Sequence, residues 1–428
     1  MLTALGVAFV ATICLGIPLA FGMGIAGAIA LLVDGSVPLK IIAQRMYAAV
    51  DSFPLMAVPF FMLAGELMGF SGILHRLVAF AEVCVGRIRG GLAHISILSA
   101  MIFAGVTGAA TAEATALGSI LIPSLREEYD LDFGCAVVAG AATIGPIIPP
   151  SMPAIIYAIL AGPSVSVAGL FLAGVIPGIL MGLGMMVIAY VIAVRRNYPV
   201  RHIQLGIREF ARRTLQALPM LLMPVIVIGG ILGGIFTATE AAAVAVVYAL
   251  VVGFAVTRQL RVRDLPGILV RSAMSTSVVA MLMATANTVS WLLTIQQVPT
   301  RIGAFLRAQS SSPWVFLLLV MFFLIIVGCL MESVAAYVMF VPILAPMAAA
   351  YGLHPLYFGF LMILNLVVGM LTPPIGIVLF VICGVAGITL ERLVRAVWPF
   401  VLWQFVVLFL VLLFPGLALW IPGLFGYR

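Results

Sequence analysis

The chain has 428 residues, of which 64% are hydrophobic and only 8% are charged, and its mean hydropathy is +1.30. A water-soluble domain carries about 25% charged residues, so this composition excludes a cytosolic enzyme, a nucleic-acid-binding protein and a disordered chain, and indicates a protein surrounded by membrane lipid. We interpret the net charge of +7 as a signal of membrane orientation and not as a polyanion-binding surface.

The hydrophobic segments predict an all-α polytopic membrane protein with ten crossings. In chain order these are 2–16, 18–33, 48–70, 133–162, 166–194, 217–235, 237–256, 272–297, 356–388 and 398–424. Two further stretches, 92–124 and 314–350, are too long for one span, and small or polar residues interrupt each midway. Both are predicted to form re-entrant hairpins, because irregular backbone at membrane depth is tolerated only where it lines a cavity within the protein.

Basic residues predict the orientation. With the N-terminus outside, 16 of the 21 Lys and Arg residues fall on the cytoplasmic side, as the positive-inside rule expects. The basic segment 195–216 is predicted to contact lipid headgroups at the cytoplasmic interface, and the segments near 36–47 and 259–271 are predicted interfacial helices. A cleavable signal peptide is not expected, since Lys40 is the first basic residue.

The two halves of the chain share a pattern at an offset of about 220 residues. Glu332 lies at nearly this offset from Glu113, and Pro373 lies at nearly this offset from Pro150. We therefore predict two inverted-topology repeats, 1–216 and 217–428. Each contains a hairpin (about 92–124 and 314–350) and a proline-broken helix (133–162 and 356–388). This architecture is typical of secondary transporters, whose site lies where the repeats meet.

Prolines interrupt both long helices, since proline lacks a backbone donor and clashes with a preceding carbonyl. The resulting free carbonyls suit a sodium ion, and free helix N-termini suit a carboxylate. We therefore expect one ion site at each break, although structural proline kinks are the alternative. The candidate sodium ligands are Thr107, Gly108, Ala109, Thr143, Gly145 and Pro149 in the first half, and Met331, Ser333, Gly369, Thr372 and Pro373 in the second.

Polar groups at predicted membrane depth are costly and suggest function. The candidates for a substrate cavity are Glu66, Glu113, Asn287, Glu332 and Asn365. Glu113 and Glu332 would either tune an ion site or cap a hairpin helix. Asn365 would either face the cavity or hydrogen-bond a neighbouring helix.

The charges within the predicted spans limit how a substrate could be bound. No Arg or Lys lies within a predicted span, so an anionic substrate would rely on sodium, helix dipoles and neutral donors. Glu240 follows Thr237 at a helix start and is expected to be a cap. The four histidines and five cysteines show no ligand spacing, so neither a transition-metal site nor a catalytic triad is predicted, and Na⁺ is the one ion expected.

Three motifs together resemble the large membrane subunit of TRAP transporters, the tripartite ATP-independent periplasmic carriers. They are AATIGPIIPPSMPAIIY (141–157), GMLTPPIG (369–376) and GIFTATEAAA (234–243), and PFFMLAGE (59–66) and GSILIP (118–123) fit as well. The resemblance covers essentially the whole chain. It implies an elevator-type carrier of the ion transporter superfamily, in which a scaffold holds still while a domain with both hairpins moves. It also implies sodium-driven import of a carboxylate such as a C4-dicarboxylate, a keto acid or a sugar acid.

The resemblance further implies a bacterial inner membrane and two partners, a small four-helix membrane subunit and a periplasmic substrate-binding protein. It assigns the first sodium site to 107–110 and 145–150, and the second to 331–333 and 369–373. At the first tip the family often has Ser-Gly-Ser and a later Asp, whereas this chain has Ala109 and Glu113. Ligation there would then rely on carbonyls and Thr107.

Two alternative functions remain open from the sequence. One is a self-sufficient sodium/anion symporter of the same architecture. The other is an intramembrane hydrolase that uses Glu113 and Glu332, which would need the two carboxyls close enough to share a water or a proton.

Overall fold

The computed structural model describes the chain except for residues 36, 201–205, 310–311 and 428, and for residues 305–309 it describes the backbone alone. The described residues form helices and no strand. The first half contains α1 (Leu2–Cys14), α2 (Leu19–Asp34), α3 (Lys40–Val50), a 3₁₀ turn (Phe53–Met56), α4 (Ala57–Phe70), α5 (Ile73–Val85), α6 (Gly91–Thr107), α7 (Ala110–Glu128), α8 (Leu131–Ala142), α9 (Met152–Ala161) and α10 (Val167–Arg195).

The second half contains α11 (Ile207–Leu232), α12 (Ala238–Val251), a π turn (Val252–Val256), a 3₁₀ turn (Val262–Asp264), α13 (Leu265–Ile295), α14 (Val298–Gln309), α15 (Pro313–Leu330), α16 (Ser333–Ala350), α17 (Pro355–Leu371), α18 (Ile377–Ala386), α19 (Leu390–Leu413) and α20 (Gly416–Leu424). Within the described part of the chain, eight helical segments are long and apolar enough to cross a membrane. They are Phe53–Phe70, Val167–Arg195, Ile207–Leu232, Ala238–Val256, Val262–Ile295, Pro313–Leu330, Ser333–Ala350 and Leu390–Leu413. The chain is therefore a multi-pass membrane protein.

The predicted interruptions of the apolar stretches are confirmed. The chain turns between α6 and α7 at Gly108, whose φ of +60° suits glycine, and between α15 and α16 at Met331 and Glu332. The first broken helix is α8 and α9, and the second is α17 and α18. Each gap contains a cis proline bond, Pro149–Pro150 or Pro373–Pro374.

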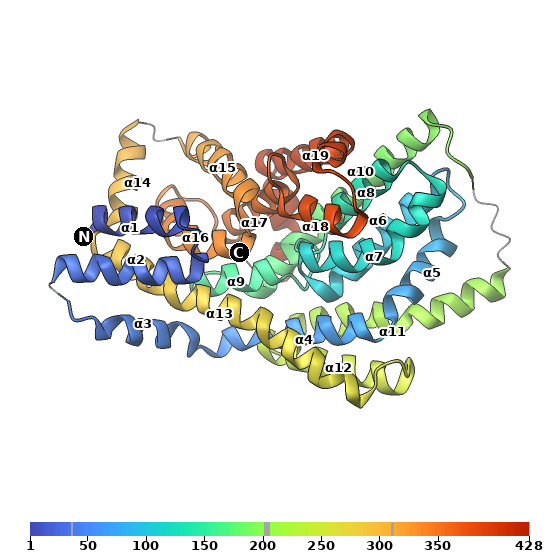
Figure 1. The fold of residues 1–428 in the computed structure, drawn as a ribbon, viewed down its shortest axis with the longest axis horizontal. Helices are drawn as coiled ribbons and strands as arrows, with labels where there is room; N and C mark the ends of the chain where they lie inside the picture. Colours follow the sequence, from blue (N-terminus) through green and yellow to red (C-terminus); the bar gives the residue numbers. More distant parts are fainter. Residues whose placement is uncertain (36, 201–205, 310–311, 428) are drawn as a thin grey trace.

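The hairpins and broken helices of the two halves pack across one another (Figure 1). In the first hairpin α6 and α7 pack on α8, and α7 also packs on α18 of the other half. In the second hairpin α15 and α16 pack on α17, and α16 also packs on α9. Each hairpin therefore contacts the broken helix of its own half and the second half-helix of the other. We call the body formed by α6–α10 and α15–α19 the hairpin body.

The remaining long helices lie along one side of the hairpin body, at the lower edge of Figure 1. Here α13 packs on α2, α3 and α4, and α12 packs on α4 and α11. We call α1–α4 and α11–α13 the framework. Helix α5 joins the two, because it packs on both α6 and α11.

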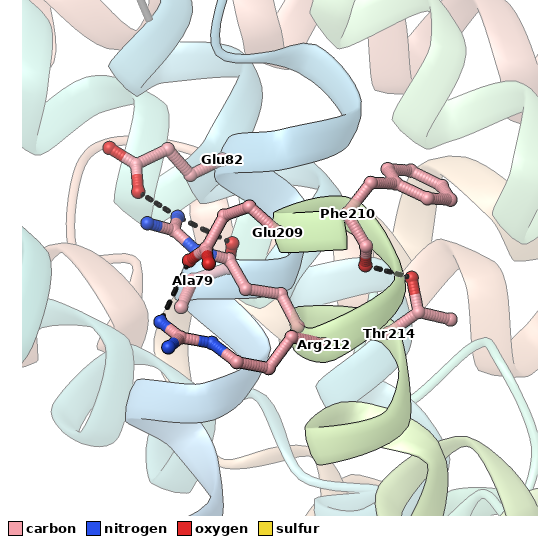
Figure 2. Close-up of polar contacts among 7 residues, drawn as sticks. Ala79, Glu82, Glu209, Phe210, Arg212 and Thr214 are labelled. Atoms are coloured by element: carbon pink, nitrogen blue, oxygen red, sulfur yellow. Dashed lines mark hydrogen bonds and ion pairs between the residues drawn. The ribbon is translucent and has the colours of Figure 1, made fainter. Parts of the chain in front are cut away.

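One arginine holds α5 to α11 through Glu82, Ala79 and Glu209, which are labelled in Figure 2. Arg213 of α11 pairs with Glu82 of α5, donates to the Ala79 carbonyl oxygen at 3.2 Å, and pairs with Glu209 at 2.8 Å. Its side chain is only 23% exposed, so these contacts are better shielded from water than a surface ion pair. Arg212 also reaches Glu209, at 3.0 Å, but is 66% exposed.

Several predicted boundaries differ from the structure, and two of these differences change how a segment is interpreted. The stretch 398–424 is not one crossing: α19 runs from Leu390 to Leu413, and α20 is a separate short helix. Pro415 explains the break, because a residue before proline disfavours helical dihedrals, and Phe414 adopts φ −121° and ψ 81°. The segment 259–271 is not a separate interfacial helix either, since α13 begins at Leu265 and places Arg271 inside a candidate span.

The other two basic segments are partly helical. Segment 36–47 overlaps α3, a helix with no fully buried residue, and residue 36 lies outside the described residues. Segment 195–216 joins α10 to the beginning of α11 at Ile207, and its residues 201–205 lie outside the described part as well.

Candidate functional site

The first hairpin tip is bonded directly to the first proline break. The Met152 amide donates to the Gly108 carbonyl at 3.3 Å. A Cβ at Gly108 would lie 2.7 Å from the Pro150 carbonyl oxygen and 3.0 Å from the Met152 nitrogen. The tip and the break are therefore in backbone contact, and a larger residue at Gly108 would push them apart.

The second tip is bonded to the second break in the same way. The Gly376 amide donates to the Cys329 carbonyl at 3.1 Å, and the Cys329 thiol lies 2.8 Å from the Thr372 carbonyl oxygen. A Cβ at Gly369 would lie 2.7 Å from Gly328 Cα. Two glycines thus let α15 and α17 cross with their backbones in contact, next to the break.

The predicted hydroxyl ligands lie at these tips and breaks. Thr143 donates to the Gly140 carbonyl at 2.6 Å, and Thr372 donates to the Val368 carbonyl at 2.7 Å. Thr107 donates weakly to the carbonyl one turn earlier, at 3.4 Å, and Ser333 donates to Glu332 Oε1 at 3.2 Å. Each hydroxyl uses its proton within the protein and keeps lone-pair capacity, which is what a cation ligand requires.

Sequence reasoning missed one residue at the first break. Gln404 of α19 is completely buried and donates from Nε2 to Thr143 Oγ1 at 2.6 Å. Its Oε1 has no hydrogen-bond partner among the described residues. The available signal was a lone amide in an otherwise apolar segment, but nothing in the local pattern linked it to a break in the other half of the chain.

The two tip glutamates occupy different positions. Glu332 is the N-cap of α16 and accepts from the amides of Val334 at 2.8 Å and Ala335 at 3.3 Å, which confirms the capping interpretation. Glu113 lies one turn inside α7, whose N-cap is Ala109, and is completely buried. Neither Glu113 oxygen has a hydrogen-bond partner in the described part of the chain.

The helix caps therefore correct the pairing of the glutamates. The two N-caps, Ala109 and Glu332, are separated along the chain by almost the same interval as the cis prolines Pro150 and Pro374. Applied to Glu113, the interval between the caps leads to Ala336, which is also buried. The interval from Glu113 to Glu332 is shorter than the interval between the two caps by about one helical turn. The two glutamates therefore do not occupy equivalent positions in the two hairpins.

The other predicted cavity residues join helices to one another. Glu66 of α4 accepts from Arg271 of α13 at 3.3 Å, and both side chains are partly exposed. Asn287 of α13 donates to the Arg45 carbonyl of α3 at 2.9 Å. We call each hairpin tip (107–110 or 329–333), together with the break that it is bonded to (143–152 or 369–376), a tip-and-break cluster. The hydrogen bonds of Glu66 and Asn287 place neither side chain in one of these clusters.

Two further predictions about capping and helix contacts are confirmed. Asn365 of α17 donates to the Met321 carbonyl of α15 at 3.0 Å, so it bonds one helix to another. Glu240 forms a capping box with Thr237 at the start of α12. Within the residues that the structure describes, no three His, Cys, Asp or Glu side chains are grouped to hold a metal ion.

A polar cluster between the ends of helices holds the base of the first hairpin. Asp130, between α7 and α8, accepts from the Tyr198 hydroxyl at 2.7 Å and from Arg196 at 2.8 Å. These contacts lower the pKa of the Asp130 carboxyl, the Tyr198 hydrogen bond most of all. The Tyr198 ring packs on Tyr129 and Phe133. The end of α10 is thereby tied to the turn between hairpin and broken helix.

Two cavities lie beside the second hairpin. One, of about 270 Å³, lies between α9, α16 and the start of α17, and its lining includes Tyr157, Pro346 and Phe358. The other, of about 220 Å³, lies between α1, α2, α13 and α16 and is mainly apolar, with Phe9, Met23 and Phe340 in its wall. Neither lining contains a predicted sodium ligand.

Known proteins match the chain over nearly its whole length. Residues 6–417 match the model of the DctM component of tripartite ATP-independent periplasmic transporters. The chain is 39% identical over 414 residues to the sialic acid TRAP transporter large permease protein SiaM of Vibrio cholerae, covering 96% of both chains. It is 37% identical over 405 residues to the C4-dicarboxylate TRAP transporter large permease protein DctM of Pseudomonas aeruginosa, covering 94% of both.

Among solved structures, the chain is similar to the YdaH transporter of Alcanivorax borkumensis, with a TM-score of 0.65, 16% identity and 98% of both chains covered. That likeness shows the fold alone. The sequence relatives are named as transporter permeases, so the chain is a transport protein and the hydrolase hypothesis is wrong. The resemblance is thus confirmed: the chain belongs to the DctM family, the large permease subunits of TRAP transporters.

Proposed function

We propose that this chain is the permease of a sodium-coupled importer that takes up a carboxylate delivered by a periplasmic binding protein. The observation that carries the proposal is the bonding of each hairpin tip to a proline break, through Met152 and Gly108 in one half and Gly376 and Cys329 in the other. Broken helices that meet hairpin tips supply carbonyls, hydroxyls and helix N-termini for ions and anionic substrates.

The residues at both tip-and-break clusters fit a sodium ion. Hard cations take oxygen ligands, and the clusters offer the hydroxyls of Thr143 and Thr372 together with backbone carbonyls. The coupling ion is part of the cargo, so its gradient would supply the driving force for uptake.

The packing supports an elevator-type movement of two inverted repeats. The hairpin body is held together by contacts between the halves, and it meets the framework through α5 and through direct contacts of α4, α11 and α13. Rigid movement of the hairpin body against the framework would expose the ion sites to each side of the membrane in turn. The basic residues favour a periplasmic N-terminus, and the family match favours a bacterial inner membrane.

The relatives support a carboxylate substrate and two partners. SiaM and DctM are named for sialic acid and for C4-dicarboxylates, and both are anionic. The longest outside connection in the proposed topology is the stretch 298–313. It is too short to enclose a ligand cleft of ~300 Å³ or more, so capture of dilute substrate would fall to a periplasmic binding protein, with a small four-helix subunit supporting the framework.

Reconstitution tests the proposal. Proteoliposomes with this chain, the small subunit and the binding protein are expected to take up substrate under an inward sodium gradient, and omission of either partner is expected to reduce uptake strongly at micromolar substrate. Equal uptake driven by a proton gradient in sodium-free buffer would contradict sodium coupling. Full sodium-driven uptake by this chain alone would favour the self-sufficient symporter.

A further inference from the structure

We propose that the two ion sites differ in charge, and that the Glu113 carboxylate is an anionic ligand of the first site, while the second site has neutral ligands only. The inference rests on the proposed sodium coupling. It gives Glu113 a specific chemical role, which the pattern of tips and breaks alone does not assign.

The first argument is that Glu113 lies against the first break. The side chain is completely buried, and its Oε2 lies where a Cβ at Gly145 would have to go. The carboxylate is therefore in contact with the backbone of the first break, close in sequence to Thr143. It points at the cluster that already holds the other candidate ligands of this site.

The second step is the lack of any compensating charge. The helices packed on α7 are α6, α8 and α18, and among their described residues none is Lys or Arg. The cation of α7 itself, Arg126, lies in the last turn of that helix, whereas Glu113 lies in the first; the two are roughly 20 Å apart along the helix axis. The α7 N-terminus contributes only about half an elementary charge.

The third step is that no hydrogen bond takes the place of that charge. Both Glu113 oxygens are without a partner among the residues described. A buried carboxylate that is neither paired nor hydrogen-bonded is strongly unfavourable, so such a group either takes up a proton or is paired with a cation or a metal ion. A sodium ion at the first break would supply both the charge and the missing contacts.

The second hairpin shows the contrast. Its buried residue at the equivalent position is Ala336, which has no charge to offer. Glu332, the acidic residue of that tip, already accepts from Val334 and Ala335 as the helix cap and from the Ser333 hydroxyl. A sodium ion at the first site would therefore be neutralised by a ligand, and one at the second would not.

Equilibrium binding of ²²Na⁺ to the purified full-length chain tests this inference without any transport step. E113Q keeps the size of the side chain and removes its charge, and E240Q is the matched control, because Glu240 caps the framework helix α12 away from both hairpin tips. At a sodium concentration that saturates the wild type, E113Q is expected to bind about half as much ²²Na⁺, while E240Q binds the wild-type amount. G145A, which keeps the charge but forces the carboxylate away from the break, is expected to behave like E113Q.

Three results would overturn the inference. If E113Q and G145A both bind as much sodium as the wild type, Glu113 is not a ligand and holds a proton instead. If E240Q loses binding to the same extent as E113Q, the loss is not specific to the first site and the assignment of Glu113 fails. If the wild type shows neither saturable ²²Na⁺ binding nor sodium-driven uptake, the proposed function fails and this inference fails with it; sodium-driven uptake with normal binding in E113Q refutes this inference alone.

Discussion

Replacing Gly369 by alanine should separate α15 from α17 at the second site. A Cβ there would lie 2.7 Å from Gly328 Cα, 2.8 Å from Gly328 C and 3.1 Å from the Cys329 nitrogen. Carbon atoms in favourable contact are about 3.5–4.0 Å apart, so the helices would have to move by roughly 1 Å. All three neighbours are backbone atoms and cannot rotate aside.

The cost follows from that geometry. Overpacking of this kind destabilises proteins by about 1–3 kcal/mol, while alanine gains up to ~1 kcal/mol over glycine in helix propensity. Gly384 of α18 isolates the second effect, because a Cβ there meets nothing within 4 Å. We therefore expect G369A to be less stable than G384A by about 1–3 kcal/mol.

Function should change along with stability at this position. The Gly369 carbonyl accepts from the Thr372 amide at 2.9 Å, so a shift of α17 moves the predicted ligands of the second site. Sodium-dependent uptake should need a several-fold higher sodium concentration in G369A than in G384A. Thermal unfolding of the purified variants measures the stability difference, and equal stability with equal sodium dependence in the two variants would refute the close-crossing argument.

Three further outcomes are expected. T372A, which removes a hydroxyl that keeps its lone pairs for a cation, should weaken apparent sodium affinity with normal expression, and unchanged sodium dependence of uptake would make Thr372 a packing residue. R213A should destabilise the chain by about 1–3 kcal/mol, because two carboxylates lose a shielded partner, whereas R212A should cost about 0.5 kcal/mol or less; equal losses in thermal unfolding would contradict the difference in shielding. Y198F should raise the lowered pKa of Asp130. A lowered folded-state pKa stabilises above the unfolded value of about 3.9, so the small stability deficit of Y198F at pH 7 should disappear as the pH falls below about 4, and a constant deficit would exclude this linkage.

Local sequence signals predicted the parts of the fold that local chemistry determines. Pro149–Pro150 and Pro373–Pro374 remove donors wherever they occur, so the helix breaks were readable without any partner. The cap at Glu240 was equally local, because a threonine three residues before a glutamate at a helix start forms a capping box.

Features that depend on distant packing were not predictable in this way. The predicted crossing 272–297 begins after Arg271, but the structure places Arg271 inside α13, where Glu66 of α4 is its partner. Gln404 approaches Thr143 only because α19 packs on α8. Neither contact leaves a trace in the spacing of residues along the chain.

The pairing of Glu113 with Glu332 shows how residue identity can mislead where geometry decides. Both residues are glutamates next to a hairpin tip. The helix caps and the cis proline bonds nevertheless give a longer interval between corresponding positions of the two halves than the interval from Glu113 to Glu332. Because one acid is a cap and the other is one turn deeper against Gly145, two hairpins of similar design differ in the charge that they bring to their breaks. The packing of α7 on α18 and of α16 on α9 then places a half-helix of each break against the opposite hairpin. Both proposed ion sites therefore lie in the hairpin body. An ion that binds between one tip and its break would also affect the packing around the other site.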